Sequence, residues 1–521
     1  MRFMDQFPGH DQFTIRVSQP RVFSTRESAG RTRQRRGRGS CDAGAQGRVA
    51  QPWASPCAAV FLPGLYVVPR SGCHLGPGAC EPGAPQQPPR SHSGAGADPG
   101  TLALLSQTAY RLRVEYLAEP LGIEALSPRF SWSLAAVPAG SRDVEQAGYR
   151  LVVTNHGTGA VALDTGMVAS SATSAAPLQL SPADSDITLD WTVEVWDDAG
   201  GASTTTRSTF GTGLLSPVGW GKARWIGGSL LRRSFTLPAP ARGKVRISCP
   251  GYCIVTVNGK RATDAVLGHQ TVYERTVLYD TYDVSRLLKH GENAIGVEVG
   301  NGWYGSFETS CQAVASNKQD CAVAMHGHSN PLKCLPTCWQ AQPGALGNQS
   351  VLLQLSVMDS AGNQTRLVSD LTWKQSAGVV VSDDIYKGET QDLRLEQEGW
   401  DTPGFDASGW ASADAVVPPD GKLLAAAYPP IRVANTTLSS QSIERLGVGR
   451  YLVDFGKNTA AIIRLEVPMS TDELTIKLTT HEQLNASGEP AGPYPSTQLF
   501  ILPKRTTPTI VQTKFTYFGF Q

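Results

Sequence analysis

The 521-residue sequence lacks any apolar run long enough to cross a membrane and any helix-period stretch long enough for a helical bundle. The short apolar run CAAVFLPGLYVV (57–68) contains a proline and a glycine and lies too far from Met1 to read as a signal peptide. Phosphate loops, nucleotide fingerprints and nucleophile elbows are also missing. These absences argue against a helical membrane protein and against the nucleotide enzymes and hydrolases that carry such motifs.

Charge of either sign is scarce, because Asp, Glu, Lys and Arg make up 17% of the chain and the net charge is +1. The first hundred residues hold twelve Arg and six acids, a balance of 12 − 6 = +6, so the remainder carries 1 − 6 = −5. A mildly acidic body gives no reason to expect a nucleic-acid partner. We therefore expect neither nucleic-acid nor membrane association.

Residues 1–105 have little to bury, and we predict a disordered tail there. This segment contains the basic run RTRQRRGRGS (31–40) and the Pro/Gly-rich stretch 76–100. Its arginines fit an anion-binding run, a solvated tail, a transit-like segment or mis-assigned coding sequence. An organelle transit peptide also needs an amphipathic helix, which is not evident.

The ten cysteines form three groups, in the tail, in a strand region and in one loop. They are Cys41, Cys57, Cys73 and Cys80, then Cys249 and Cys253, then Cys311, Cys321, Cys334 and Cys338. The loop group allows two disulfides with three pairings, or a zinc site with His326 and His328, although the spacing matches no standard zinc pattern. Cys249 and Cys253 would lie about 13 Å apart on an extended strand, too far for a disulfide unless Pro250-Gly251 bends the chain.

Four Asn-x-Ser/Thr sequons, at Asn348, Asn363, Asn435 and Asn485, favour a secreted or organellar location over the cytoplasm. No clean signal peptide accompanies them, so the location stays open.

From about Tyr110 onward the chain alternates apolar and polar residues in short runs that end in Gly, Asp or Asn turns, a pattern typical of half-buried antiparallel strands. One such run, 189–201, places Trp191, Val193 and Val195 on one face. Asn258-Gly259 between two apolar runs predicts a type I′ hairpin. We predict an all-β protein.

At about one domain per 150 residues, the length allows three or more domains. The predicted units are a fibronectin- or immunoglobulin-like sandwich (106–215), a jelly-roll-like sandwich (220–425) with a Cys-rich insertion (309–350), and a third sandwich (428–521) that we expect to be truncated.

Several motifs in order resemble those of bacterial-type α-L-rhamnosidases. They are LRVEYLAEPLGIEALSPRFSWSL (112–134), the 258–259 hairpin with TVLYDTYDV (276–284) and GNGWYG (300–305), YKGETQDLRLEQEGWDTPGFDASGW (386–410), and PPIRV (429–433) with VDFGKN (453–458) and FTYFGFQ (515–521). The resemblance covers about 110–521 apart from the insertion. It implies several β-sandwiches that precede an (α/α)6 catalytic barrel.

In that family an acid and a base carboxylate on the helical barrel remove terminal α-L-rhamnose with inversion, and such pairs stand about 6.5–9.5 Å apart. The resemblance ends about where the barrel should begin, so we predict an accessory portion, inactive as this chain, without catalytic residues. Carboxylates such as Glu389, Asp392, Asp454 and Glu482 fall on predicted strands and turns. The alternative is a stand-alone carbohydrate-binding or structural β-sandwich protein.

A sugar site in the second sandwich is the candidate that the resemblance supports, because some members carry a calcium-assisted rhamnose-binding module there. Asn301, Trp303 and Tyr304 supply an amide and two aromatic rings on a Gly-flanked turn, with Asp264 and Glu298 as further oxygen donors. The other interpretation is that both rings pack the end of the sandwich.

Asn301 stands where such calcium sites commonly have Asp, so the expected cofactor set is none, with calcium as the open alternative. The expected partners are rhamnose-containing glycans or glycosides.

Overall fold

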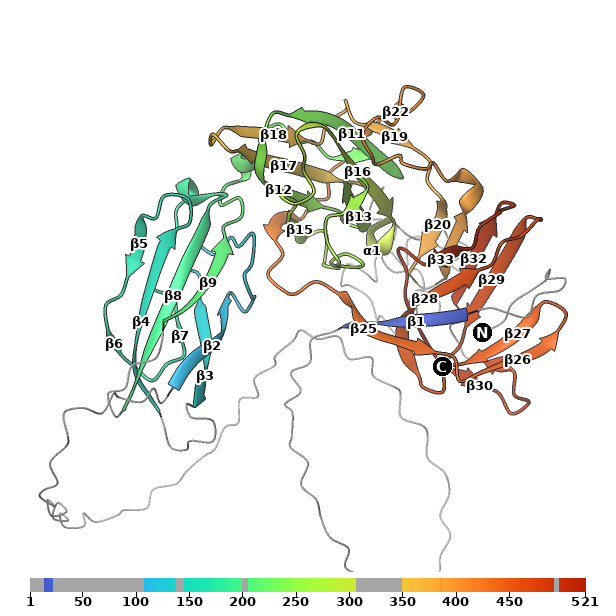
Figure 1. The fold of residues 1–521 in the computed structure, drawn as a ribbon, viewed down its shortest axis with the longest axis horizontal. Helices are drawn as coiled ribbons and strands as arrows, with labels where there is room; N and C mark the ends of the chain where they lie inside the picture. The colour runs from blue at the N-terminus through green and yellow to red at the C-terminus, as the bar shows by residue number, and fades with distance from the viewer. Residues whose placement is uncertain are drawn as a thin grey trace, which may run out of the picture. The chain divides into compact units, whose positions relative to one another are not determined.

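The computed structural model describes residues 14–21, 107–136, 145–198, 205–305, 349–385, 387–491 and 496–521. Within these ranges nearly all regular structure is β-strand, which confirms the predicted all-β class (Figure 1). The only α-helix that they contain is the single turn α1 (Gly302–Gly305). No helix in this part of the chain combines the length and apolar character that a membrane crossing requires.

The first unit is a sandwich of two antiparallel sheets. One sheet has the order β5-β4-β8-β9 with β6 on β4, and the other has the order β2-β3-β7. Their bounds are β2 (Gln107–Val114), β3 (Phe130–Ala136), β4 (Gln146–Asn155), β5 (Val161–Asp164), β6 (Val168–Ala169), β7 (Ser174–Ala175), β8 (Thr188–Asp197) and β9 (Thr206–Gly211). Trp191, Val193 and Val195 are buried in the core between the sheets, as the alternation predicts.

The second unit packs a six-stranded sheet, β14-β13-β16-β11-β19-β22, on a five-stranded sheet, β18-β17-β12-β15-β24. Their bounds are β11 (Leu230–Leu237), β12 (Pro240–Ser248), β13 (Tyr252–Val257), β14 (Lys260–Arg261), β15 (Thr276–Asp283), β16 (Gly291–Gly300), β17 (Leu352–Asp359), β18 (Gln364–Val368), β19 (Lys374–Ser376), β22 (Ala411–Ser412) and β24 (Lys422–Ala425). The two-stranded sheet of β10 (Ile226–Gly227) and β23 (Asp414–Ala415) accompanies them. Asn258 and Gly259 join β13 to β14 with φ of 53° and 76°, which confirms the hairpin.

The third unit also has two sheets around one core. The first has the order β25-β1-β28-β33 with β34 on β28, and the second has the order β20-β21-β32-β29. Their bounds are β1 (Thr14–Arg21), β20 (Val380–Asp384), β21 (Gly388–Asp392), β25 (Arg432–Ser439), β28 (Thr459–Val467), β29 (Leu474–Thr480), β32 (Ser496–Leu502), β33 (Thr509–Gln512) and β34 (Phe518–Phe520). Two short hairpins complete it, β26 (Ser442–Gly447) with β27 (Arg450–Asp454), and β30 (Gln483–Leu484) with β31 (Pro490–Ala491).

Two segments, which form three strands, pair differently from the predicted organisation. Residues 14–21, assigned to the disordered tail, form β1 between β25 and β28, where the blue strand lies among orange ones in Figure 1. Residues 380–392, assigned to the second sandwich, form β20 and β21, and β21 pairs in parallel with β32 of the third. In both cases the pairing partners lie about a hundred to more than four hundred positions away, beyond the reach of local patterns. The rest of the predicted tail and the Cys-rich loop lie outside the described residues.

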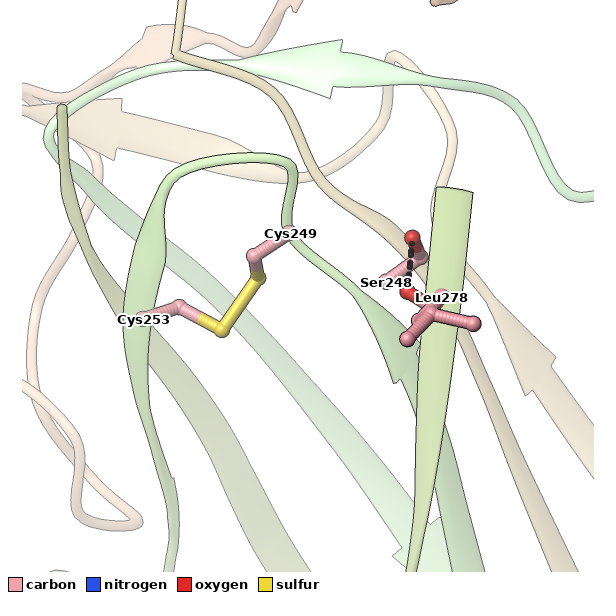
Figure 2. Close-up of a disulfide and its surroundings, with 4 residues drawn as sticks. All are labelled: Ser248, Cys249, Cys253 and Leu278. Atoms are coloured by element: carbon pink, nitrogen blue, oxygen red, sulfur yellow. Dashed lines mark hydrogen bonds between the residues drawn. A yellow bond between two sulfur atoms is a disulfide. The ribbon is translucent and has the colours of Figure 1, made fainter. Parts of the chain in front are cut away.

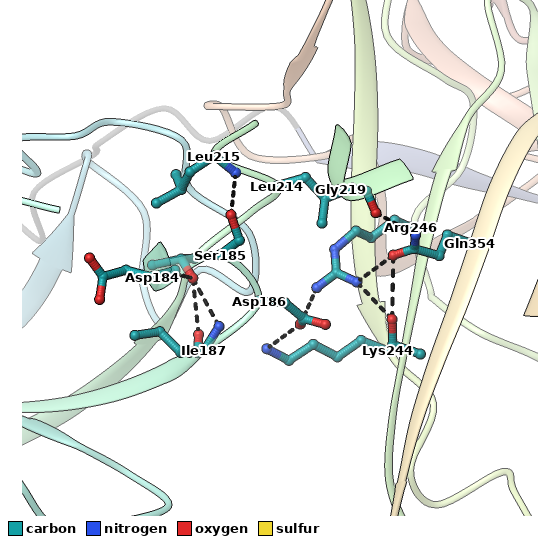
Figure 3. A network of polar contacts seen from close by, with 12 residues as sticks. Asp184, Ser185, Asp186, Ile187, Leu214, Leu215, Gly219, Lys244, Arg246 and Gln354 are labelled. Atoms are coloured by element: carbon teal, nitrogen blue, oxygen red, sulfur yellow. Dashed lines mark hydrogen bonds and ion pairs between the residues drawn. The ribbon is translucent and has the colours of Figure 1, made fainter. Parts of the chain in front are cut away.

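A buried ion cluster joins the first and second units (Figure 3). Asp186 pairs with the fully buried Arg246 of β12 and lies 3.6 Å from Lys244 Nζ. Arg246 Nη1 also donates to Ser356 Oγ at 3.2 Å, and Gln354 Nε2 donates to the Gly219 carbonyl at 2.8 Å. Burial lowers the pKa of Lys244, whereas the Asp186 carboxylate favours its charged form. The charged cluster therefore depends on Asp186.

Candidate functional site

The candidate sugar-binding turn lies directly after β16, where Gly300 and Asn301 lead into α1. The turn is packed too tightly for side chains at two glycines. A Cβ on Gly251 would lie 2.3 Å from the Gly300 carbonyl oxygen, and one on Gly300 would lie 2.3 Å from the Phe515 ring. Glycine at both positions therefore lets two loops close onto the turn.

The loop on one side of the turn is closed by a disulfide between Cys249 and Cys253 (Figure 2). The two Cα atoms are 6.2 Å apart, because Pro250-Gly251 bends the chain between β12 and β13. The separation of about 13 Å that Cys249 and Cys253 would have on an extended strand is therefore wrong, because the chain bends between them. The disulfide fixes Gly251 where it contacts the backbone of Asn301.

The two aromatic residues of the turn pack at the end of the sandwich. Tyr304 is 4% exposed, and its ring centroid is 5.2 Å from that of Tyr273 in an edge-to-face contact. Burial raises the pKa of Tyr304. Trp303 is half-buried against the same small cluster, which includes Val277. Tyr304 thus matches the packing interpretation, and Trp303 is the aromatic residue of the turn that keeps exposed surface.

Asn301 is held by β20 of the third unit. Its backbone N–H donates to Asp383 Oδ2 at 2.8 Å, and its Nδ2 donates to the Asp383 carbonyl at 3.0 Å. The first bond fixes the backbone of Asn301, and the second fixes the orientation of its side-chain amide. Asp383 is 5% exposed, and burial, more than any neighbour, raises its pKa to about 7.

The two additional oxygen donors do not join Asn301. Glu298, on β16, accepts from Lys514 Nζ at 2.8 Å and 2.9 Å. Asp264 is exposed and pairs with Arg432 Nε at 2.6 Å. Arg261 lies within electrostatic reach of both carboxylates. The structure therefore brings together Asn301, Trp303 and Tyr304, and it engages the other two in ion pairs.

The remaining carboxylates singled out by the sequence have structural contacts. Glu389 is 1% exposed and accepts backbone hydrogen bonds from the segment after β33. Asp392 pairs with Arg394, and Asp454 accepts from a turn amide two residues on. The Glu482 side chain lies against the backbone of β34. None of these contacts resembles the opposed acid and base of an inverting glycosidase.

Sequence reasoning missed Asp383, which holds the turn. The only local signal was an acidic residue at the end of an otherwise apolar run, VVVSDD. Within the described residues no group of three or more His, Cys, Asp and Glu is arranged to hold a metal. The proposed zinc loop lies outside those residues.

Two family models match the chain, and the second of them extends past the second unit to include β20 and β21. The family model described as "Rha78A-like, N-terminal immunoglobulin domain" matches residues 109–216, and "Alpha-L-rhamnosidase N-terminal domain" matches residues 239–435. An α-L-rhamnosidase of Formosa agariphila is 27% identical over 409 residues, which are 71% of this chain and 40% of that protein.

Two solved structures share the fold. The α-L-rhamnosidase from Dictyoglumus thermophilum has a TM-score of 0.66 and 27% identity, over 79% of this chain and 46% of that one. The Streptomyces avermitilis α-L-rhamnosidase complexed with L-rhamnose has a TM-score of 0.59 and 19% identity, over 80% and 55%. This chain thus spans about half the length, or less, of these proteins. The chain belongs to the α-L-rhamnosidase family, of which it contains the N-terminal immunoglobulin-like and β-sandwich domains.

Proposed function

We propose that this chain is the accessory, rhamnose-recognising part of an α-L-rhamnosidase, and that the turn at 301–304 contacts terminal rhamnose of glycans or glycosides. The observation that carries the proposal is the ordered match to both N-terminal domains of the family across 109–435. The complete protein would hydrolyse terminal α-L-rhamnose with inversion, through carboxylates on a helical barrel.

The turn has the chemistry that such a role needs. An aromatic face packs on the apolar face of a pyranose, and an amide bonds its hydroxyls. Trp303 would supply the ring, and Asn301, oriented by its two bonds to Asp383, would present its Oδ1 oxygen. Tyr304 would support Trp303 from the core side, since both pack on the Tyr273 cluster.

The test is isothermal titration calorimetry of the 521-residue protein with L-rhamnose. We expect saturable binding that Trp303→Ala weakens tenfold or more, because truncation of a hot-spot aromatic contact costs about 2 kcal/mol or more and a tenfold loss corresponds to about 1.4 kcal/mol. Tyr116→Ala, which removes an aromatic residue 64% exposed on the first unit, is the matched control and should bind as the unaltered protein does. Equal affinity of the two variants would contradict the assignment of the turn.

Calcium enters the same experiment. Asn301 offers a neutral oxygen where a calcium site favours a carboxylate, so we propose that binding does not require the ion. The affinity for L-rhamnose should be the same with a chelator as with about 1 mM CaCl2, a concentration on the order of the Kd of weak calcium sites. A gain of affinity with calcium would instead support the calcium-assisted alternative.

A further inference from the structure

Two buried acids face each other across the β20–β21 pair. The antiparallel register places Asp383 opposite Glu389, and their exposed fractions are 5% and 1%. Side chains directly opposite in such a pair have Cβ atoms about 5 Å apart and share one face of the sheet. Two carboxylates at this separation, away from water, are strongly disfavoured when both are ionised.

Each acid holds a different loop. Asp383 accepts from the backbone N–H of Asn301, and Glu389 accepts from the backbone N–H groups of Lys514 and Phe515 at 3.1 Å and 2.8 Å. The Phe515 ring lies directly against Gly300. The two carboxyl groups and the two loops therefore form a closed ring of contacts around the candidate turn.

The surroundings assign the proton to Asp383. Glu389 also accepts from the amide of Gln391, and the nearby Lys514 cation favours its ionised form. Asp383 faces Glu389 on β21, the phenol of Tyr252 on β13 and Asp384 on its own strand. It has no ion-pair partner among the described residues. Burial raises the pKa of both acids, and that of Asp383 reaches about 7.

We propose that the Asp383–Glu389 pair holds one proton near neutral pH, carried by Asp383, and that its loss loosens the Asn301–Tyr304 turn. A second charge opposite Glu389 would draw water into the ring of contacts, and the turn, which Asp383 positions, would lose its fixed geometry. The consequence for sugar affinity rests on the function proposed above. The loosening of the turn does not, since it concerns the fold alone.

The test is hydrogen exchange by mass spectrometry on the full chain between pH 5.5 and 8.5, expressed as protection factors so that intrinsic exchange is removed. We expect peptides that cover 300–305 and 514–516 to lose protection tenfold or more, with a midpoint near the pKa of about 7. Asp383→Asn, which keeps the shape and carries no charge, should abolish the step. Glu389→Gln should move the midpoint to lower pH, because it removes the facing charge.

Asp359→Asn is the control, since within the described residues this carboxylate at the end of β17 accepts hydrogen bonds only from the turn that follows and should leave the step unchanged. Constant protection of the unaltered protein, or a step that persists in Asp383→Asn, would overturn the proposal. If Asp383→Asn does not fold, the Glu389→Gln shift decides, and an unmoved midpoint refutes a proton held by the pair. Rhamnose titrations at pH 6 and 8.5 are read separately: a protection step without sugar binding refutes the proposed function and leaves this inference standing.

Discussion

The buried arginine between the first two units makes a quantitative prediction. Arg246 is fully buried and contacts Asp186, Gln354 and Ser356. In Arg246→Met the volume of the side chain is nearly kept, while Asp186 loses its bonded cation. Removing one member of a buried ion pair costs about 3–5 kcal/mol, mostly because the other charge stays buried without a partner.

We take the lower end of this range, about 3 kcal/mol, for two reasons. Lys244 remains 3.6 Å from the carboxylate, and the Asp186 side chain is 12% exposed and can recruit water. The reverse variant should be Asp186→Asn rather than Ala, because Asp186 has a φ of 61° and Asn tolerates this left-handed conformation. Asn also keeps a hydrogen-bond acceptor for the guanidinium.

Urea unfolding of the four proteins of the double-mutant cycle, followed by tryptophan fluorescence and circular dichroism, measures the coupling. We expect the double variant to cost about 2 kcal/mol less than the sum of the single variants, as is usual for directly bonded charges. The Arg246–Asp186 pair would not hold the first two units together if Arg246→Met lowered the free energy of unfolding by less than about 0.5 kcal/mol. Strict additivity of the two single variants would refute the same view.

Three further predictions concern the turn and the activity. Folding raises the pKa of Asp383 from 3.8 to about 7, so the stability that its protonated form contributes is complete below pH 4 and is lost as the pH rises through 7. In urea unfolding across pH 4–8, the free energy of unfolding of Asp383→Asn should therefore gain up to about 4 kcal/mol over that of the unaltered protein. A difference that stays constant with pH would contradict this. Replacing both Cys249 and Cys253 by Ala opens a five-residue loop and should cost about 2 kcal/mol by the same measurement, whereas an unchanged value would mean that the bend holds without its disulfide. If the proposed accessory role is correct, the purified chain should release no 4-nitrophenol from its α-L-rhamnoside, because that role leaves the acid–base pair to a helical barrel, and any release above a boiled control would refute it.

Local patterns were sufficient for the elements whose partners are close in sequence. The period-two alternation of Trp191, Val193 and Val195 reports a strand with one buried face, and the structure buries that face. Asn258-Gly259 reports a hairpin because few residue pairs adopt positive φ at both positions, and the structure has it. In both cases the physical constraint acts within about ten residues.

The β1 strand, which the sequence did not predict, and the Cys249–Cys253 bend, which it left open, obey constraints from far along the chain. β1 consists of eight residues in a segment whose composition offers little to bury, and its strand state depends on β25 and β28, more than 400 positions later. The bend at Pro250-Gly251 brings Cys249 and Cys253 together, and its partners are Gly300 and Asn301. A strand or a bend that is stabilised by residues distant in sequence leaves only a weak pattern in its own residues.

The same reasoning explains why the turn was predicted and the acid that holds it was not. Asn301 and Trp303 lie in the six-residue motif GNGWYG, which by itself indicates a glycine-flanked turn with an amide and two aromatic rings. Asp383 sits in a strand where period two alone makes it a surface residue or a core residue, depending on which sheet covers it. Its role comes from the pairing of β20 with β21 and from the docking of Asn301 on its carboxylate, two contacts that no window of sequence contains. Residues that position a turn from another domain are therefore best sought among buried charged groups in the folded structure, because burying a carboxylate costs free energy that a specific set of donors has to offset.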